Sequence, residues 1–122
     1  VITQKDIREV QLAKAAIAAG IKVLVSKIGR EMDEIANLYL AGGFGSYIDK
    51  RNAIRIGLIP PELQHRIIAL GNAAGTGAML SLLSLAEYER TNTIKAKAEY
   101  VELSSTPEFQ NEYVDSMYFE SP

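Results

Sequence analysis

The sequence contains no cysteine and no tryptophan, and His65 is the single histidine among its 122 residues. Without cysteine the chain has no disulfide framework, no thiol nucleophile, no thiolate zinc site and no ligands for an iron–sulfur cluster. His65 follows Pro60-Pro61 in a polar stretch, which favours a surface residue over a general base, and no Ser–His–Asp set can be assembled around it. These absences exclude several classes of catalytic site before any motif is considered.

Long apolar runs are also missing. No stretch reaches the ~18 residues that a membrane-spanning helix requires, and no signal-peptide pattern opens the chain. The composition, with 48% hydrophobic and 23% charged residues, is that of a globular domain. We therefore expect no membrane partner and a cytoplasmic protein, and the lack of cysteine fits a reducing compartment.

Basic residues are missing from the end of the chain. Residues 99–122 carry six acidic side chains and no basic ones, whereas residues 1–98 carry 13 basic and nine acidic side chains. A loose basic cluster lies in the middle, formed by Lys50, Arg51, Arg55 and Arg66. Because no basic stripe alternates with aromatic residues, we expect no nucleic-acid partner and interpret both groups as solvated faces.

The pattern from Thr3 to about Gly29 favours one long helix. Thr3 and Asp6 have the spacing of a capping box, and apolar residues then recur at intervals of three, four or seven. The later half is apolar on most sides, which predicts burial between other elements, while Lys14 interrupts the stripe and argues against a coiled coil. Gly20 costs about 1 kcal/mol relative to alanine unless a close neighbour requires the space.

The chain lacks an initiator methionine and begins just before this helix. Natural chains seldom begin in this way. We therefore expect residues 1–122 to form a single domain that is the C-terminal part of a longer protein.

The rest of the chain alternates short apolar runs with helical segments, a pattern typical of α/β layer architectures. We expect strands over 36–41, 66–70 and 100–103, and helices over 50–56, 72–89, 92–98 and 107–115. Asp49, Thr91 and Thr106 are the expected N-caps, and Asp49 is more plausible in that role than as a metal ligand. The aromatic residues of the tail, Tyr113, Tyr118 and Phe119, are expected to anchor the last helix on the sheet.

Two glycine clusters are the most informative feature of the sequence. Gly42, Gly43 and Gly45 follow the first predicted strand, and a second cluster at 71, 75 and 77 follows the next. Glycine at the carboxyl end of a strand permits positive φ and close approach of a ligand to the backbone, and ligands of open α/β sheets bind outside those strand ends. Tight turns and close helix packing are the structural alternative.

Two familiar nucleotide motifs are absent. The stretch Gly43-Phe-Gly-Ser-Tyr-Ile48 has isoleucine where a dinucleotide fingerprint requires glycine or alanine, and no acidic residue follows at the required distance. No G-K-[ST] sequence of a phosphate loop exists in the chain.

The stretch Leu38-Tyr-Leu-Ala-Gly-Gly-Phe-Gly-Ser46 resembles the adenosine motif of the actin, sugar-kinase and heat-shock-chaperone ATPase superfamily. Gly71-Asn-Ala-Ala-Gly-Thr-Gly-Ala78 is similar to the second connecting helix of that superfamily, which packs at an interdomain hinge. More narrowly, nearly the whole chain resembles one family, the C-terminal domain of the ATP-dependent reductive activators of corrinoid proteins. That likeness is carried by residues 2–16, 41–49, 53–58 and 101–109.

The resemblance implies an α/β fold, namely a C-terminal subdomain of a ribonuclease H-like, actin-like ATPase with few short strands and long packing helices. It implies ATP or ADP with Mg as ligands, and a [2Fe–2S] cluster only in an N-terminal ferredoxin-like domain that this chain lacks. It also implies a corrinoid protein or corrinoid-dependent methyltransferase as partner, whose Co(II) is returned to Co(I). The phosphate loops and the metal-binding aspartate of the family are missing here, so the chain alone should catalyse nothing.

The resemblance assigns Gly42 and Gly43 to backbone contacts with the ribose and the α-phosphate. Phe44 and Ser46 match positions that often contact the base, and Gly45 belongs to the same motif. No catalytic residue and no metal ligand is assigned to this chain.

Two alternatives stay open. The first is a non-catalytic interaction or dimerisation module that uses the long opening helix as its partner surface. The second is the same lobe of a related actin-like ATPase or of a sugar kinase. A nucleotide site needs the Gly42-Gly43 turn to be open, whereas an interaction module allows it to be covered. Apolar surface left by a missing half would also favour a homodimer of the isolated chain.

Overall fold

The computed structural model of the protein describes residues 1–119, so Glu120 of the acidic end lies outside the described residues. Contacts between Cα atoms divide the chain into two compact units. The first unit contains residues 1–38, 49–67 and the described residues from 102 on, and the second contains residues 39–48 and 68–101.

The first unit is built on α1 (Gln4–Lys27), the long helix that the sequence predicts. The capping box is confirmed, because the Thr3 hydroxyl accepts from the Asp6 backbone N–H and the Asp6 carboxylate accepts from the Thr3 N–H. The expected burial of the later half is confined to one face of small residues, namely Ala15, Ala18, Ala19, Gly20 and Val23. Small side chains on this face allow another helix to approach closely.

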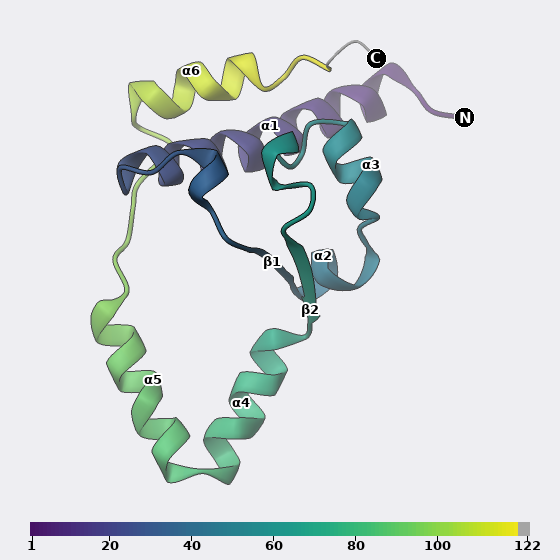
Figure 1. Ribbon diagram of the computed structural model, residues 1–122. Helices are drawn as coiled ribbons and strands as arrows, with labels where there is room; N and C mark the ends of the chain where they lie inside the picture. Colours follow the sequence, from purple (N-terminus) through teal and green to yellow (C-terminus); the bar gives the residue numbers. More distant parts are fainter. Residues whose placement is uncertain (120–122) are drawn as a thin grey trace. The chain divides into compact units, whose positions relative to one another are not determined.

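The last helix, α6 (Pro107–Asp115), lies along α1 (Figure 1). Its predicted start is confirmed, because the Thr106 hydroxyl accepts from the Phe109 N–H and proline occupies the first turn. The prediction that the tail anchors on the sheet is wrong. The segment after α6 bonds to α1 instead, with Gln11 Nε2 donating to the Met117 carbonyl at 3.3 Å.

Lys14 holds the end of α6 in place. Its side chain is buried, and Nζ donates to the carbonyl oxygens of Ser116 at 2.7 Å and Tyr118 at 2.6 Å. The same Nζ lies 4.9 Å from the centre of the Phe119 ring, a cation–π distance. A cation is also favourable at the C-terminal end of a helix dipole. The residue that interrupts the apolar stripe of the sequence is therefore part of the core.

Short helices complete the first unit. α3 (Lys50–Arg55) begins at the predicted cap, where the Asp49 carboxylate accepts from the Asn52 N–H at 2.8 Å. The unit also contains two 3₁₀ turns: η1 (Met32–Glu34), which precedes the first strand, and η2 (Pro61–Leu63), which follows α3. The Arg66 guanidinium donates to the Ile35 carbonyl at 2.8 Å and joins η1 to the segment before the second strand.

The sheet has two strands, β1 (Leu38–Ala41) and β2 (Ile67–Gly71). The two strands are parallel. The Leu38 N–H at the start of β1 donates to the carbonyl of Arg66, the residue just before β2. The fold class predicted from the sequence, α/β with few short strands and long helices, is confirmed. The third predicted strand, over residues 100–103, is wrong: that segment pairs with no other strand among the described residues.

The second unit contains most of the sheet and three helices: α2 (Gly42–Tyr47), α4 (Ala73–Leu83) and α5 (Leu85–Lys97). The loop predicted after β1 is therefore wrong, because the glycine segment forms the short helix α2. The predicted helix over 72–89 is divided at Ser84, which ends α4 and caps α5 by accepting from the Glu87 N–H. Thr91 is not a cap but lies inside α5, where its hydroxyl donates to the Tyr88 carbonyl.

α4 and α5 pack against each other as a helical hairpin (Figure 1). Within the described part of the chain, no helix has both the length and the apolar character that crossing a membrane would require.

Candidate functional site

The candidate site lies at the carboxyl ends of β1 and β2, inside the second unit. β1 ends at Ala41, and the next residue, Gly42, has a φ of +66°, a conformation that other residues adopt only with strain. A Cβ built on Gly42 or on Gly43 would meet no heavy atom within 4 Å. The turn at Gly42 and Gly43 is therefore open, as a nucleotide site at this position requires.

Gly45 has a different environment from its two neighbours. A Cβ at this position would lie 2.3 Å from the Leu40 carbonyl oxygen and 3.0 Å from the Gly71 nitrogen. α2 thus lies directly against the ends of both strands, and only glycine allows this approach. The contact also brings the two glycine clusters of the sequence together at one edge of the sheet.

Two further predicted site residues lie on α2. Phe44 is 55% exposed, and Tyr47, which no sequence motif indicated, is 90% exposed. The Ser46 hydroxyl donates to the Gly42 carbonyl at 3.4 Å. Exposed aromatic rings beside an open backbone turn can stack on a planar ligand.

The second glycine cluster starts α4. Gly71 has a φ of +61°, and the following Asn72 caps the helix by accepting from the Gly75 N–H at 3.0 Å. A Cβ on Gly75 would lie 2.5 Å from the Asn72 amide nitrogen, so the Asn72 side chain would have to shift if a larger residue stood there. Gly77 has no heavy atom within 4 Å of its Cβ position, so close packing does not explain it.

The site carries no charged side chain of its own. Residues 42–48 and 71–81 contain no Asp, Glu, Lys, Arg or His. An anionic group would therefore meet only backbone N–H groups and the positive end of the α4 dipole. Such a site can bind a ligand through its backbone N–H groups.

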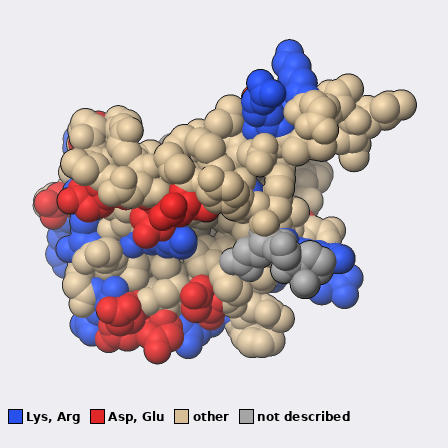
Figure 2. All heavy atoms as spheres, turned by 90° about the horizontal axis from the view of Figure 1, so that it is seen from above, with Lys and Arg blue, Asp and Glu red and all other residues tan. Residues whose placement is uncertain are grey.

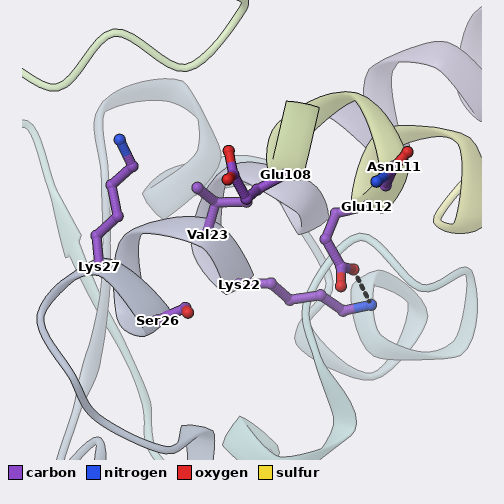
Figure 3. Close-up of a pocket in the computed structure, with 7 residues that line it drawn as sticks. All are labelled: Lys22, Val23, Ser26, Lys27, Glu108, Asn111 and Glu112. Carbon is purple, nitrogen blue, oxygen red and sulfur yellow. Dashed lines mark hydrogen bonds and ion pairs between the residues drawn. The ribbon is translucent and has the colours of Figure 1, made fainter. Parts of the chain in front are cut away.

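A separate hollow lies in the first unit, between α1 and α6. It has a volume of about 510 Å³, and the ion pair between Lys22 Nζ and Glu112 crosses it at 3.0 Å (Figure 3). Val23 and Ser26 line its α1 side. On the face viewed in Figure 2, acidic side chains likewise lie beside Lys and Arg in mixed groups. The hollow is a seam between packed helices and brings no reactive set of side chains together. Sequence periodicity gives no sign of it.

The short parallel strands and packing helices are those expected of a fragment of an actin-like ATPase, and comparison with known families agrees. Residues 1–121 match the family described as the C-terminal domain of RACo, the ASKHA domain. The chain therefore belongs to this family, as the resemblance in the sequence implies.

Individual relatives agree with this assignment. The chain is 42% identical over 119 residues to a corrinoid activation enzyme, RamQ, of Eubacterium limosum, covering 98% of this chain and 20% of that protein. It is 27% identical over 115 residues to the [Co(II) methylated amine-specific corrinoid protein] reductase of Methanosarcina barkeri, covering 93% and 21%. A solved structure of a reductive activator for corrinoid,iron-sulfur protein superposes with a TM-score of 0.86 at 34% identity, covering 97% and 19%. The chain thus spans about a fifth of the length of these relatives.

Proposed function

We propose that this chain forms the adenosine side of the nucleotide site in an ATP-dependent reductive activator of corrinoid proteins. The relatives named above are a corrinoid activation enzyme, a corrinoid-protein reductase and a reductive activator. The observation that carries the proposal is the open turn at Gly42 and Gly43, in which Gly42 has a left-handed backbone conformation, at the strand end where ligands of parallel α/β sheets bind.

In this proposal the five residues of the motif have different roles. The backbone of Gly42 and Gly43 approaches the ribose and the α-phosphate, since no side chain stands in the way. The exposed Phe44 ring and the Ser46 hydroxyl face the base. Gly45 acts indirectly, because its contact with the two strand ends holds α2 in position.

The chemistry of the reaction would come from elsewhere in the complete protein. Since the site lacks charged residues, groups outside this chain would bind Mg and the outer phosphates of ATP. Since the chain lacks cysteine, a [2Fe–2S] cluster would be held by another domain. The reduced cluster would give one electron to Co(II) of the corrinoid partner and form Co(I), and ATP hydrolysis would drive this unfavourable transfer. A single domain at the C-terminal end of a longer cytoplasmic protein remains our prediction for this chain.

The open turn favours this proposal over an interaction module, which allows the turn to be covered. The surface that the interaction module would use is also reduced, because α6 lies along the later half of α1.

The test is nucleotide affinity in the complete protein. We expect Gly43→Val to weaken Mg–ATP and Mg–ADP binding at least tenfold in calorimetry, because its side chain would occupy the open space above the turn. Ala13→Val, at an exposed position of α1, is the matched control and should leave the affinity unchanged. Unchanged nucleotide affinity in a folded Gly43→Val protein would disprove the assignment.

A titration of this chain with Mg–ADP, followed by amide NMR, tests the same site directly. We expect shifts confined to residues 42–46 and the first turn of α4, with affinity as weak as millimolar because only half of the site is present.

A further inference from the structure

A basic hollow on the surface of the first unit has no role in the site described above. It has a volume of about 430 Å³ and is lined by Lys50, Arg51, Ile54, Arg55, Gln64 and His65. Three of these side chains are cations and none is acidic, although the chain as a whole has a net charge of −2. We call these six residues the α3 basic surface.

The described residues supply no ion-pair partner for the three cations. No carboxylate of the described residues lies within ion-pair distance of Lys50, Arg51 or Arg55. The nearest carboxylate along the chain, that of Asp49, caps α3 by accepting from the Asn52 N–H. Lys50 Nζ donates to the Ile67 carbonyl at 3.1 Å, which leaves its charge uncompensated.

Two of the three charges are placed unfavourably for the helix that carries them, whereas Arg55 lies in its last turn, where a cation is favourable. Lys50 is the first residue of α3, where the positive end of the helix dipole repels a cation. Arg51 and Arg55 are four residues apart on the same helix, and like charges at this spacing destabilise it. Helix stability therefore does not explain why Lys50 and Arg51 are basic.

The shape of the surface indicates what kind of anion it fits. Lys50, Arg51, Arg55, Gln64 and His65 are all exposed, and no buried donors converge on one point as they do in a site for a small anion. Long cationic side chains spread over a shallow surface instead suit a partner whose negative charges are also spread out.

We propose that the α3 basic surface is the docking surface for a carboxylate-rich face of the corrinoid protein that the complete activator reduces. This inference rests on the proposed function for the identity of the partner. Charge complementarity would steer the two proteins together and set the rate of their association.

The test reverses two charges in the complete protein, Arg51→Glu together with Arg55→Glu. We expect the association rate constant with the corrinoid protein to fall at least tenfold at 50 mM NaCl. The difference should shrink at 300 mM NaCl, because salt screens interactions between exposed charges. Folding should be retained, since both side chains are exposed and a carboxylate at position 51 is favourable at a helix N-terminus. The milder pair Arg51→Gln and Arg55→Gln should lower the rate about threefold.

The control carries the same change of charge on another surface, with Lys5→Glu and Lys27→Glu at the two ends of α1. We expect its association rate to change less than twofold. An equal loss in this control, or an unchanged rate in the Arg51/Arg55 variant, would overturn the inference. So would binding of inorganic pyrophosphate that depends on both arginines while association with the corrinoid protein does not.

Nucleotide affinity separates this inference from the proposed function. The Arg51/Arg55 variant should bind Mg–ATP as tightly as the unmodified protein. If Gly43→Val leaves ATP affinity intact, the proposed nucleotide site fails, whereas the charge dependence of association is judged by the rate measurement alone.

Discussion

The two units of the chain differ in how much apolar surface they bury. All buried hydrophobic side chains of the described residues belong to the first unit, namely Ala15, Ala18, Ala19, Val23, Ala53, Ile59, Leu63 and Ile67. In the second unit every residue is at least partly exposed, and Leu82, Leu83 and Leu85 are 87%, 78% and 74% exposed. Burial is the main favourable term in folding. The first unit therefore has a core of its own, and the second does not.

This difference bears on the candidate site, because the open glycine turn lies in the unit that buries little apolar surface. Local stability follows the number of buried apolar contacts, and regions that bind ligands often lie at the low end. We therefore expect the second unit to open more readily than the first, and four predictions test this comparison.

The largest effect is expected in the first unit at Lys14. Lys14→Met keeps the volume of the side chain but removes the donor to the Ser116 and Tyr118 carbonyl oxygens. Leaving these acceptors without a partner should lower the free energy of unfolding by about 2–4 kcal/mol. Urea unfolding measures this loss. Lys5→Met, at an exposed position of the same helix, should change this free energy by less than about 0.5 kcal/mol. Equal effects of the two variants would show that the hydrogen bonds of Lys14 do not stabilise the first unit.

The second unit is tested at two neighbouring glycines. Gly45→Ala forces a Cβ against the Leu40 carbonyl oxygen and should cost about 1–3 kcal/mol. Gly43→Ala has open space and should be neutral or stabilising by about 0.5–1 kcal/mol, because alanine favours helix.

The readout for this pair is amide hydrogen exchange. Gly45→Ala should accelerate exchange in residues 39–48 and 68–75 and leave α1 protected, since the units have separate sources of stability. Loss of protection throughout α1 would show that the two units unfold together.

Local signals account for the parts of the fold that the sequence predicts well. Thr3, Asp49 and Thr106 each accept from a backbone N–H three residues later, so the whole interaction is visible in a stretch of four residues. The open turn at Gly42 follows from the same kind of reasoning, since a glycine after a strand permits positive φ.

The errors come from interactions that a local pattern does not contain. A strand over 100–103 requires a partner strand, and the apolar character of the run does not supply one. The burial of Lys14 depends on carbonyl groups more than 100 residues later in the chain. The break between α4 and α5 occurs at Ser84 without glycine or proline, so no breaker signal marks it. The special position of Gly45 likewise depends on Gly71, which lies on the other strand.

A smaller effect is expected at Gly20, inside the buried face of α1. A Cβ at this position would meet Leu103 Cδ1 at 3.7 Å, an ordinary contact. The space reserved for a close neighbour is therefore large enough for a methyl group. Gly20→Ala should stabilise the first unit by about 0.5–1 kcal/mol, measured by urea unfolding. A loss of stability would mean that α1 and the 102–106 segment are packed too tightly for one more carbon atom.

The smallest effect concerns the capping box at the start of α1, which lies in the first unit but outside its core. The hydrogen bonds from the Thr3 hydroxyl and the Thr3 backbone N–H lower the pKa of the Asp6 carboxyl below its usual value. Because the pKa is lower in the folded state, the contribution to stability is complete above the unfolded pKa of about 3.9 and is lost as the pH falls through the folded value. NMR titration should give a midpoint for Asp6 below that of an ordinary aspartate, and Thr3→Ala should raise it. An unchanged midpoint in Thr3→Ala would show that the box does not persist in solution, and the first unit would then depend on its core alone.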